Sequence, residues 1–386
     1  MKLVMADPSL FTGRYDDALC AALARRGHKV TLAGRPMRAT DAIRPQGYDY
    51  APYFFRAGEA VRGSERLRRL AKAADYMLGG LLGSQAVFAG ADLVHWQWLP
   101  LAMADRHWLK RLRGRHALVH TVHNAQPFHD ANAGAAVQGR GYFDLLERFD
   151  ALIVHGEETL AALKERGIRT PVHIVPHPPM MLAQAGPDEL AAVPPSPRPR
   201  ILFFGTIKPY KGFDLLIEAA LALWGEGIDF DLAVAGQPFM PIDDPVTAVI
   251  AAGRGDRLIL DLGFLKEGRL VAHLRRADII VFPYRHIDSS GAFLSALGYG
   301  AAMVTSDCGM FGRLPAGSVR QFPTGDGPAL TDVLRGLLLS EGARRDAGAA
   351  AAAARATLGT WDEAAALTEA AYVAAIDAAR CRGVRP

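Results

Sequence analysis

With 386 residues, the chain is too long for one ordinary hydrophobic core, so we expect two domains of similar size. Half of the residues are hydrophobic, which suits well-buried α/β layers, but no stretch of about 18 apolar residues is free of charge, so a transmembrane helix is not expected. The formal net charge of +4 is too small and too dispersed to indicate nucleic-acid binding, and the three scattered cysteines form neither a disulfide framework nor a zinc motif.

Apolar, strand-like runs alternate with helical patterns along almost the whole chain. The first run, Met1 to Asp7, has the pattern of a strand and lacks the apolar core and cleavage site of a signal peptide, so we expect a cytoplasmic protein. The predicted strands are 3–6, 29–33, 93–98, 118–123, 152–155 and 172–175 in the first half, and 201–204, 230–235, 258–262, 279–282 and 302–305 in the second. Continuous apolar strands separated by helices predict parallel sheets with helices on both faces.

Segment 59–72 is rich in basic residues and runs into the apolar residues 76–78 and 81–82. Its cations are Arg62, Arg66, Arg68, Arg69 and Lys72. Two interpretations stay open. A basic helix that continues into an apolar stretch can lie on an anionic membrane surface. The same pattern also describes the solvated arginine face of an ordinary domain helix.

Residues 178–199 interrupt the alternation with a series of prolines, and we expect no helix or central strand there. We therefore predict a proline-rich linker at 179–199 between two Rossmann-like, doubly wound α/β domains at 1–178 and 200–358. Two such domains are expected to face a cleft, because open α/β sheets bind their ligands outside the carboxyl ends of the strands.

The alanine-rich tail is predicted to form two helices that separate near Gly359. Periodic Leu358, Trp361, Leu367 and Tyr372 indicate packed helices rather than a low-complexity segment. The second of these two helices, within 359–386, is a candidate to pack back on the N-terminal domain.

The loop after the predicted strand 201–204 carries Gly205, Lys208, Lys211 and Gly212, and an amphipathic helix follows it. A strand, a cationic turn and a helix N-terminus form a suitable receptacle for a phosphate-bearing ligand. An ordinary polar turn with solvated lysines is the alternative for this loop taken alone.

The second informative region runs from 283 to 300, after the strand 279–282. Asp288 or Ser289 can cap a helix that opens at Ser290, Gly291 and Ala292. Small residues at this point let a ligand phosphate approach the backbone amides closely. A well-capped helix without a ligand is the alternative.

The order and spacing of these regions resemble the glycosyltransferases of the GT-B fold, most closely the large retaining family 4, over almost the whole chain. Five matching segments lie in the second half: the donor-phosphate loop 205–212, the strand 233–236 that ends in a glycine, 262–265 beside the nucleotide base, the strand 277–284 and the stretch 296–307. Three more lie in the first half, at 121–124, 155–158 and 175–178.

The resemblance implies a set of site residues. The catalytic candidates are His123, Lys208 and Lys211. The donor-binding candidates are Gly205, Thr206, Gly236, Phe264, Leu265, Tyr284, Asp288, Ser289, Ser290, Gly291, Ala292 and Ser295. The candidates on the acceptor side are Gly13, Asn124 and His129.

One departure from the family pattern concerns the donor helix. The family usually carries two glutamates, and the matching positions here are Ile287 and Ser295. Ser295 can accept hydrogen bonds from ribose hydroxyls only weakly, and Asp288 is the candidate substitute for the first glutamate. We interpret this as the character of a subfamily.

The implied reaction moves a sugar from a nucleotide-diphosphate donor to a saccharide or lipid-linked saccharide, with retention and without a metal or other cofactor, in the cytoplasm or at the inner membrane face. Lys208 and Lys211 would stabilise the leaving diphosphate. Two alternatives remain: an inverting transferase with Asp130 as its base, and a non-catalytic protein that binds sugar nucleotides. The Asp229-Phe230-Asp231 triplet begins a strand, opposite the ligand edge of the sheet. Histidines 116, 120, 123 and 129 cluster in sequence but lack a compelling metal pattern, so no metal site is predicted.

Overall fold

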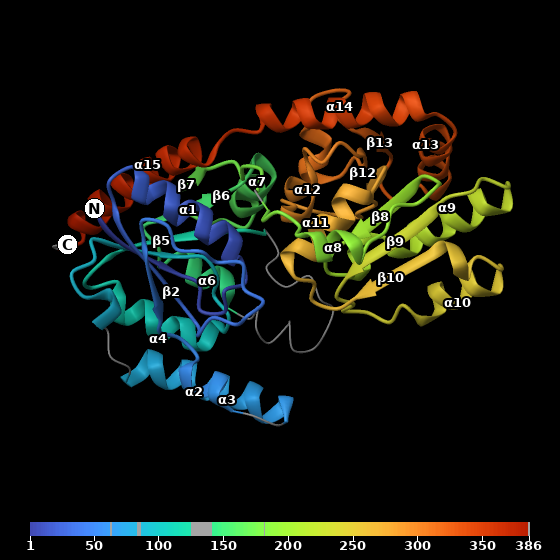
Figure 1. The fold of residues 1–386 in the computed structure, drawn as a ribbon. Coiled ribbons are helices and arrows are strands. Elements are labelled where there is room, and N and C mark those ends of the chain that lie inside the picture. The colour runs from blue at the N-terminus through green and yellow to red at the C-terminus, as the bar shows by residue number, and fades with distance from the viewer. Residues whose placement is uncertain (62–63, 83–85, 125–140, 181, 385–386) are drawn as a thin grey trace. The chain divides into compact units, whose positions relative to one another are not determined.

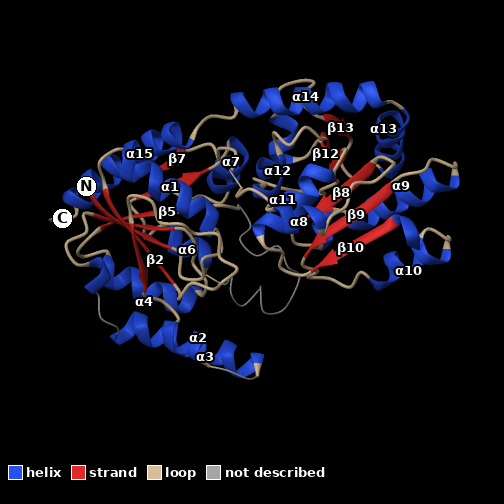
Figure 2. Ribbon diagram, viewed as in Figure 1, coloured by secondary structure: helices blue, strands red, loops and turns tan. Residues whose placement is uncertain are grey.

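The computed structural model describes residues 1–61, 64–82, 86–124, 141–180 and 182–384, which form two compact units. The first unit combines Met1–Pro178 with Thr360–Pro386, and the second comprises Pro179–Gly359. Each unit is built around one parallel sheet with helices beside its strands (Figure 1, Figure 2). The units are described separately below.

The sheet of the first unit has seven strands in the order β3-β2-β1-β4-β5-β6-β7, and its neighbouring strands are parallel. The strands are β1 (Lys2–Ala6), β2 (Lys29–Gly34), β3 (Asp49–Pro52), β4 (Leu93–Trp96), β5 (Ala117–Val122), β6 (Ala151–Val154) and β7 (Val172–Ile174). The chain moves from β1 out to β3 and then returns to the other side of β1 with β4. The switch point of this sheet, where such folds bind ligands, therefore lies between the carboxyl ends of β1 and β4.

Helices connect these strands and cover the sheet. They are α1 (Gly13–Arg25), α2 (Arg56–Ala60), α3 (Glu65–Leu82), α4 (Ala102–Leu112), α6 (Tyr142–Leu146), α7 (Glu157–Glu165) and α15 (Trp361–Cys381), with the short 3-10 helix η1 (Ala86–Phe88). Although α15 ends the described chain, it contacts α1, β5 and β6. Figure 1 shows the red α15 beside the blue α1.

The sheet of the second unit has six strands in the order β10-β9-β8-β11-β12-β13, again with parallel neighbours. The strands are β8 (Arg200–Phe204), β9 (Asp231–Gly236), β10 (Leu258–Leu262), β11 (Ile279–Phe282), β12 (Ala302–Ser306) and β13 (Arg320–Phe322). Its switch point lies between β8 and β11.

The helices of the second unit are α8 (Pro187–Ala191), α9 (Phe213–Gly225), α10 (Asp243–Ala251), α11 (Glu267–Arg276), α12 (Gly291–Ala296), α13 (Gly327–Leu339) and α14 (Glu341–Thr357). Short 3-10 helices lie between them: η2 (Pro209–Lys211), η3 (Gly255–Arg257) and η4 (Gly309–Arg313). No helix in the described part of the chain is long and apolar enough to span a bilayer.

The central strands are buried on both faces, which explains their continuous apolar sequences. In β8, Ile201 and Phe203 enter one hydrophobic cluster while Leu202 and Phe204 enter another. Because successive side chains point to opposite faces of a strand, each sheet separates two core layers. The predicted fold, two doubly wound α/β domains, is confirmed.

The strand predictions hold to within a few residues, with three instructive differences. Strands β3 and β13 are missing from the prediction. Both are short strands at the edge of their sheet, and their residues are mostly half-buried or exposed. The predicted strand 93–98 ends at Trp96, so Gln97 and Trp98 belong to the loop at the switch point. This shortening places Trp98 at the carboxyl edge rather than within the sheet.

The expected linker at 179–199 is more structured than its prolines indicate. The segment belongs to the second unit and contains α8, which contacts α11. Pro187 is compatible with this helix because it occupies the first turn, where a missing N–H costs no hydrogen bond. The expectation that no helix forms here was therefore wrong.

The two helices predicted for the tail are α14 and α15, and Thr360 caps α15 in a capping box with Glu363. Tyr372 is fully buried in the first unit, and Trp361 packs against the same cluster. Leu367, which was expected to pack, is 45% exposed because it lies on the outer face of α15.

Candidate active site

The loop after β8 carries a buried cation. Lys211 ends η2 and is only 6% exposed, which disagrees with the alternative of an ordinary polar turn with solvated lysines. Its ammonium lies 5.2 Å from the centre of the Tyr284 ring, and a Cβ placed on Gly205 would lie 3.4 Å from it. Burial, followed by the charge of Lys208, lowers the pKa of Lys211 to about 7. Lys208 is half-buried, with its ammonium 5.7 Å from the centre of the Phe239 ring.

Two glycines let the loops at this edge pack backbone against backbone. Gly212 has a φ of +67°, and a Cβ there would lie 1.9 Å from the carbonyl oxygen of Pro283. Gly236 has a φ of +149°, and a Cβ there would lie 1.9 Å from the carbonyl oxygen of Gly205. Both positions therefore require glycine, which holds the loops after β8, β9 and β11 together.

An ion pair fastens the same two loops. Arg285, after β11, donates to both carboxylate oxygens of Asp214 at 2.9 and 2.6 Å, and its backbone N–H donates to the carbonyl of Tyr210 at 2.7 Å. Asp214 lies in the first turn of α9, so this turn interacts with Arg285. The hydrogen bonds from Arg285 lower the pKa of Asp214 and outweigh its partial burial.

The expected cap of the donor helix is shifted by one residue. Ser290, rather than Asp288 or Ser289, caps α12 by accepting from the N–H of Phe293 at 3.2 Å, and the helix begins at Gly291. Ser295 is buried, and its hydroxyl donates to the carbonyl of Gly291 at 2.6 Å. The Ser295 hydroxyl therefore forms its hydrogen bond within α12.

Two buried hydroxyl groups in the segment after β11 have no hydrogen-bond partner among the described residues. They belong to Tyr284, which is 1% exposed, and to Ser289. Burial, followed by the neighbouring Tyr210, raises the pKa of Tyr284 above its usual value. Unsatisfied buried polar atoms are rare in folded proteins, so these hydroxyls indicate a place where a polar ligand can bind.

Exposed aromatic rings lie at the ends of β9 and β10. Phe264 is 73% exposed and Phe239 is 55% exposed, and their ring centres are 6.3 Å apart. The neighbouring Leu265 packs partly against the core. The sequence analysis identified Phe264 but missed Phe239, because Phe239 follows the strand-end glycine by three residues and belongs to no recognised motif. Thr206 and Ala292, half-buried like Asp288, complete the predicted donor set.

In the first unit, His123 follows β5 and has protein partners at both ring nitrogens. Its Nε2 lies 2.8 Å from Oε1 of Gln97, and its Nδ1 lies 3.1 Å from Nε2 of His155. The ring stacks on Trp98 with an interplanar angle of 8°. Burial, followed by the charges of His155 and His177, lowers the pKa of His123 well below its usual value.

These contacts leave two proton arrangements for the cluster. The carbonyl of Val175 accepts from Nδ1 of His155 at 3.0 Å, so a neutral His155 must accept at Nε2 from Nδ1–H of His123. His123 then accepts at Nε2, which requires the amino group of Gln97 to face it instead of the amide oxygen. With the oxygen facing His123, the histidine pair holds an extra proton and one positive charge. Burial favours the neutral arrangement.

The cluster also connects His123 to the C-terminal helix. His95 lies 2.7 Å from the hydroxyl of Tyr372 on α15 and 2.7 Å from Thr121, and the end of the Gln97 amide that faces away from His123 lies 3.4 Å from it. A hydrogen bond from His123 to a substrate requires one of its present partners to be exchanged, and its predicted role remains a prediction.

Of the three candidates on the acceptor side, two can be placed. Gly13 begins α1 next to the loop after β1, and a Cβ there would lie 3.0 Å from Cδ1 of Ile43. Asn124 directly follows His123 and is half-buried. His129, like the alternative base Asp130, lies outside the described residues. Among the described residues no group of three or more His, Cys, Asp or Glu is placed to hold a metal ion.

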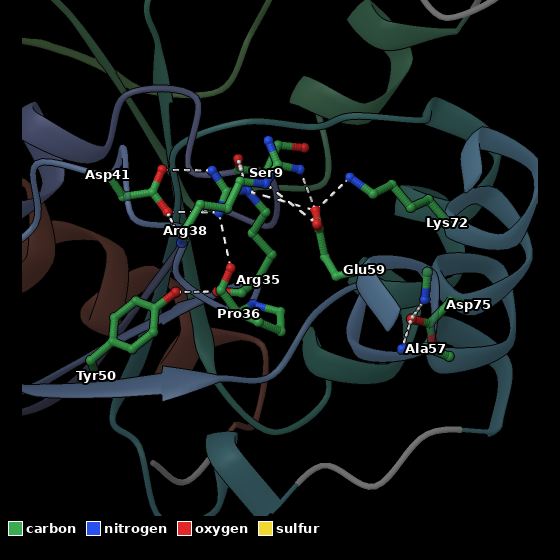
Figure 3. A network of polar contacts seen from close by, with 11 residues as sticks. Ser9, Arg35, Pro36, Arg38, Asp41, Tyr50, Ala57, Glu59, Lys72 and Asp75 are labelled. Atoms are coloured by element: carbon green, nitrogen blue, oxygen red, sulfur yellow. Dashed lines mark hydrogen bonds and ion pairs between the residues drawn. The ribbon is translucent and has the colours of Figure 1, made fainter. Parts of the chain in front are cut away.

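A polar network joins α3 to the carboxyl edge of the sheet in the first unit (Figure 3). Arg35, directly after β2, donates to the carbonyl of Ser9 at 3.2 Å and to both carboxylate oxygens of Asp41 at 2.7 and 2.8 Å. Glu59 pairs with Arg38 and with Lys72 of α3. Burial acts to raise the pKa of Glu59, but the bonds from Arg38 and Lys72 outweigh it and lower the pKa.

Comparisons with known proteins agree with this geometry. The family model described as Glycosyltransferase Family 4 matches residues 12–178, and the model described as Glycosyl transferases group 1 matches residues 198–339. Sucrose-phosphate synthase from Thermosynechococcus elongatus has a similar structure, with a TM-score of 0.72 and 18% identity, and the match covers 97% of this chain and 98% of that chain.

Two curated relatives are similar in sequence. GDP-mannose:glycolipid 4-beta-D-mannosyltransferase of Xanthomonas campestris pv. campestris is 28% identical over 98 residues, which are 25% of this chain and 27% of the relative. Lipopolysaccharide core biosynthesis mannosyltransferase LpcC of Rhizobium leguminosarum bv. viciae is 29% identical over 201 residues, which are 48% of this chain and 54% of the relative. The chain thus spans between a quarter and about half of the length of these relatives. Since the two family models together match most of both units, the chain belongs to the glycosyltransferases of the GT-B fold and resembles family 4.

Proposed function

We propose that the chain transfers a sugar from a nucleotide-diphosphate donor, bound by the second unit, to a saccharide or lipid-linked saccharide bound by the first. The observation that carries this proposal is the buried Lys211 at the switch point between β8 and β11. Among the described residues no carboxylate pairs with it, and the unsatisfied Tyr284 hydroxyl belongs to the ring beneath its ammonium. A bound diphosphate would supply both the counter-charge and a hydrogen-bond acceptor.

The leaving nucleoside diphosphate gains negative charge as the bond to the sugar breaks. A fixed cation in a site that excludes water stabilises such a charge far better than it would in water, and one such contact contributes about 3 to 4 kcal/mol. Lys208 adds a second positive charge at the same loop. We therefore propose that the reaction needs no metal ion, so activity should survive EDTA, and a complete loss that magnesium or manganese reverses would contradict this.

GDP-mannose is the donor to test first, because the Xanthomonas relative is named for it and both curated relatives are named mannosyltransferases. Phe239 and Phe264 offer exposed ring faces on which a nucleobase could stack. The names of the relatives also mention a glycolipid and the lipopolysaccharide core, which supports a lipid-linked acceptor.

Helix α3 supports membrane contact through a stripe of exposed leucines. Leu67, Leu70, Leu78 and Leu81 are 59%, 61%, 56% and 46% exposed. Their spacing places them along one side of the helix, opposite the buried Tyr76. Arg66 and Arg68 are exposed on either side of this stripe, whereas Arg62 lies outside the described residues. We propose that this face lies on an anionic membrane surface of the cytoplasmic leaflet.

Retention of the anomeric configuration is the stereochemical outcome we propose, on the basis of the family 4 resemblance. Inversion is the second candidate, favoured by the β linkage in the name of the Xanthomonas relative. The base considered for inversion, Asp130, is not among the described residues. With GDP-α-D-mannose as the donor, an α-linked product indicates retention and a β-linked product indicates inversion, and proton NMR of the product distinguishes the two.

A thermal-shift panel of GDP-, UDP- and ADP-sugars tests donor binding, because a ligand stabilises the folded state according to its affinity. One nucleotide should raise the melting temperature in the wild type but much less in Lys211→Met. A shift without any transfer to glycolipid acceptors would indicate the non-catalytic alternative. No shift with any nucleotide sugar would contradict the proposed function.

A further inference from the structure

Phe11 and Trp98 form a pair of aromatic rings at the switch point of the first sheet, in which Phe11 is exposed and Trp98 is half-buried. Phe11 follows β1 and Trp98 follows β4, the two strands between which this switch point lies. Their ring centres are 4.7 Å apart at an interplanar angle of 59°. His123, at the end of β5, stacks on Trp98 with ring centres 5.3 Å apart. Three neighbouring strand ends thus contribute one continuous series of rings.

The side chain of Phe11 faces solvent, although its neighbour in sequence is buried. Phe11 is 69% exposed, more than any other large apolar side chain in the described part of the first unit, whereas Leu10 is 8% exposed. Leu10 adopts a φ of +51°, a left-handed conformation that is strained for a leucine. Such strain persists where the surrounding structure imposes it, and it is concentrated at functional sites.

A chain of hydrogen bonds that ends at the buried carboxylate of Asp7 holds the side chain of Trp98 in place. Its indole N–H donates to Oγ1 of Thr12 at 3.0 Å, and the N–H of Thr12 donates to Oδ2 of Asp7 at 3.0 Å. Asp7 and the neighbouring Asp16 are fully buried, and burial raises the pKa of both carboxyl groups. The orientation of Trp98 is therefore set before any ligand arrives, which lowers the entropy cost of binding.

We propose that Phe11 and Trp98 form an aromatic platform that binds the C–H face of a pyranose ring of the acceptor. The proposal rests on the transferase function proposed above and specifies how its acceptor is recognised. The negative face of an aromatic ring attracts the slightly positive C–H groups of a sugar. A β-glucopyranoside, whose hydroxyls are equatorial, presents the axial hydrogens of C1, C3 and C5 on one face. We therefore expect an acceptor with a flat, unsubstituted ring face of this kind.

Saturation-transfer NMR with methyl β-D-glucopyranoside tests the platform in the absence of a donor. H1, H3 and H5 of the probe should receive more saturation than H2 and H4. D-glucitol, which carries similar hydroxyls but no rigid ring face, serves as the control and should show little transfer. No saturation of the glucoside in the wild-type protein would overturn the proposal.

Variants connect this binding to the two rings. Phe11→Ala and Trp98→Leu should reduce the saturation signal and raise the KM for a lipid-linked acceptor by about threefold to tenfold, the range measured for aromatic contacts. Trp98→Phe keeps a ring and should retain most of the binding. Val373→Ala removes a side chain that is 51% exposed on α15 and should change neither quantity.

Measurements on the same variants separate the two proposals. The KM for the donor and the donor-induced thermal shift should stay at wild-type values in Phe11→Ala and Trp98→Leu. If the wild type transfers sugar and these variants keep its acceptor KM, the platform is refuted while the transferase function stands. If the wild type binds no nucleotide sugar, the transferase function fails, and the NMR experiment still decides whether the platform binds a pyranose.

Discussion

At the residue scale, the burial of Lys211 is the feature with the largest chemical consequence. The sequence places this lysine in a polar loop, but the close packing of that loop against the loop after β11 removes it from water. A buried ammonium destabilises the unliganded protein and prepares the site for an anion. The charge of Lys211 is therefore expected to strengthen donor binding and to weaken the stability of the unliganded protein.

We expect Lys211→Met to reduce turnover by about 100-fold or more, because it removes a cation from the leaving diphosphate. The same change should raise the melting temperature of the unliganded protein at pH 6, because methionine fills similar space without a buried charge. Steady-state kinetics and calorimetry measure the two effects. Near-normal turnover would remove Lys211 from the mechanism.

The lowered pKa of Lys211 predicts a dependence of stability on pH. An unfolded lysine keeps its proton to about pH 10.4, whereas Lys211 in the folded protein loses it near pH 7. Between these values the unfolded state binds more protons, so this group makes stability rise with pH from about 7 to 10. The rise should be absent in Lys211→Met.

Donor binding should show the opposite trend with pH, because a diphosphate favours the protonated lysine. At pH 8 binding should take up protons, which calorimetry in buffers of different ionisation enthalpy measures, and affinity should fall as the pH rises further. A donor affinity that does not change between pH 6 and pH 9 would contradict the proposed contact.

Gly212→Ala should destabilise the second unit by about 2 kcal/mol or more, because the new methyl group would collide with the carbonyl of Pro283 and the residue has a positive φ. Donor binding should be lost with it. Gly225→Ala is the matched control, since a Cβ there meets nothing within 4 Å. Equal melting temperatures for the two variants would show that the close approach is not required.

At the scale of elements, α3 combines two different faces. Its inner face is fixed by the buried hydrogen bond from Tyr76 to Asp105 of α4 at 2.6 Å and by the pair between Lys72 and Glu59. Its outer face carries the exposed leucines. The basic composition of this segment left two interpretations open, and the orientation of the helix in the fold supports the membrane surface.

The double substitution Leu70→Gln and Leu78→Gln should weaken binding to anionic liposomes at least tenfold, because two apolar side chains that would be buried in the interface are lost. Co-sedimentation measures the effect. Leu339→Gln on α13, where the leucine is 69% exposed, is the control and should bind like the wild type. Replacing Arg66 and Arg68 with Gln should also reduce binding, as should raised salt. Unchanged binding in the leucine variant would leave α3 as an ordinary solvated helix.

At the scale of the whole molecule, the chain returns to its first unit after completing the second. Helix α15 adds Tyr372, Ala375 and Ala379 to the core formed by β1, α1 and β5. Ion pairs from Arg25 to Asp362 and from Arg26 to Glu369 lie beside this core. The first unit is therefore complete only when the last helix has been added.

Ala375→Glu should destabilise the first unit by several kcal/mol, because an unpaired charge would be placed where the native side chain is fully buried. Hydrogen exchange should accelerate in α1 and β5 and stay unchanged in β8 and β11. Val373→Glu, two residues away on the exposed face of α15, should leave both patterns as in the wild type. Equal acceleration in the two units would contradict the division of the chain.

The sequence by itself determined the fold class and most of the strands. Continuous apolar runs such as 279–282 cannot be buried on both faces except in a covered parallel sheet, and the glycines at 212 and 236 mark places where backbone must approach backbone. Both signals are local sequence patterns, so they can be recognised without knowledge of the tertiary structure. The donor-side candidates rest on the resemblance to a family, and their role remains a prediction.

Only the tertiary structure decided the properties that depend on distant neighbours. Lys211 is buried because Pro283 and Tyr284 come from another strand, and His123 has two protein partners because Gln97 and His155 follow different strands. Trp98 leaves the predicted strand and meets Phe11 because the strand order places the ends of β1 and β4 side by side. Strand order is set by which connections pack together across the whole sheet, and no local pattern of residues contains that information.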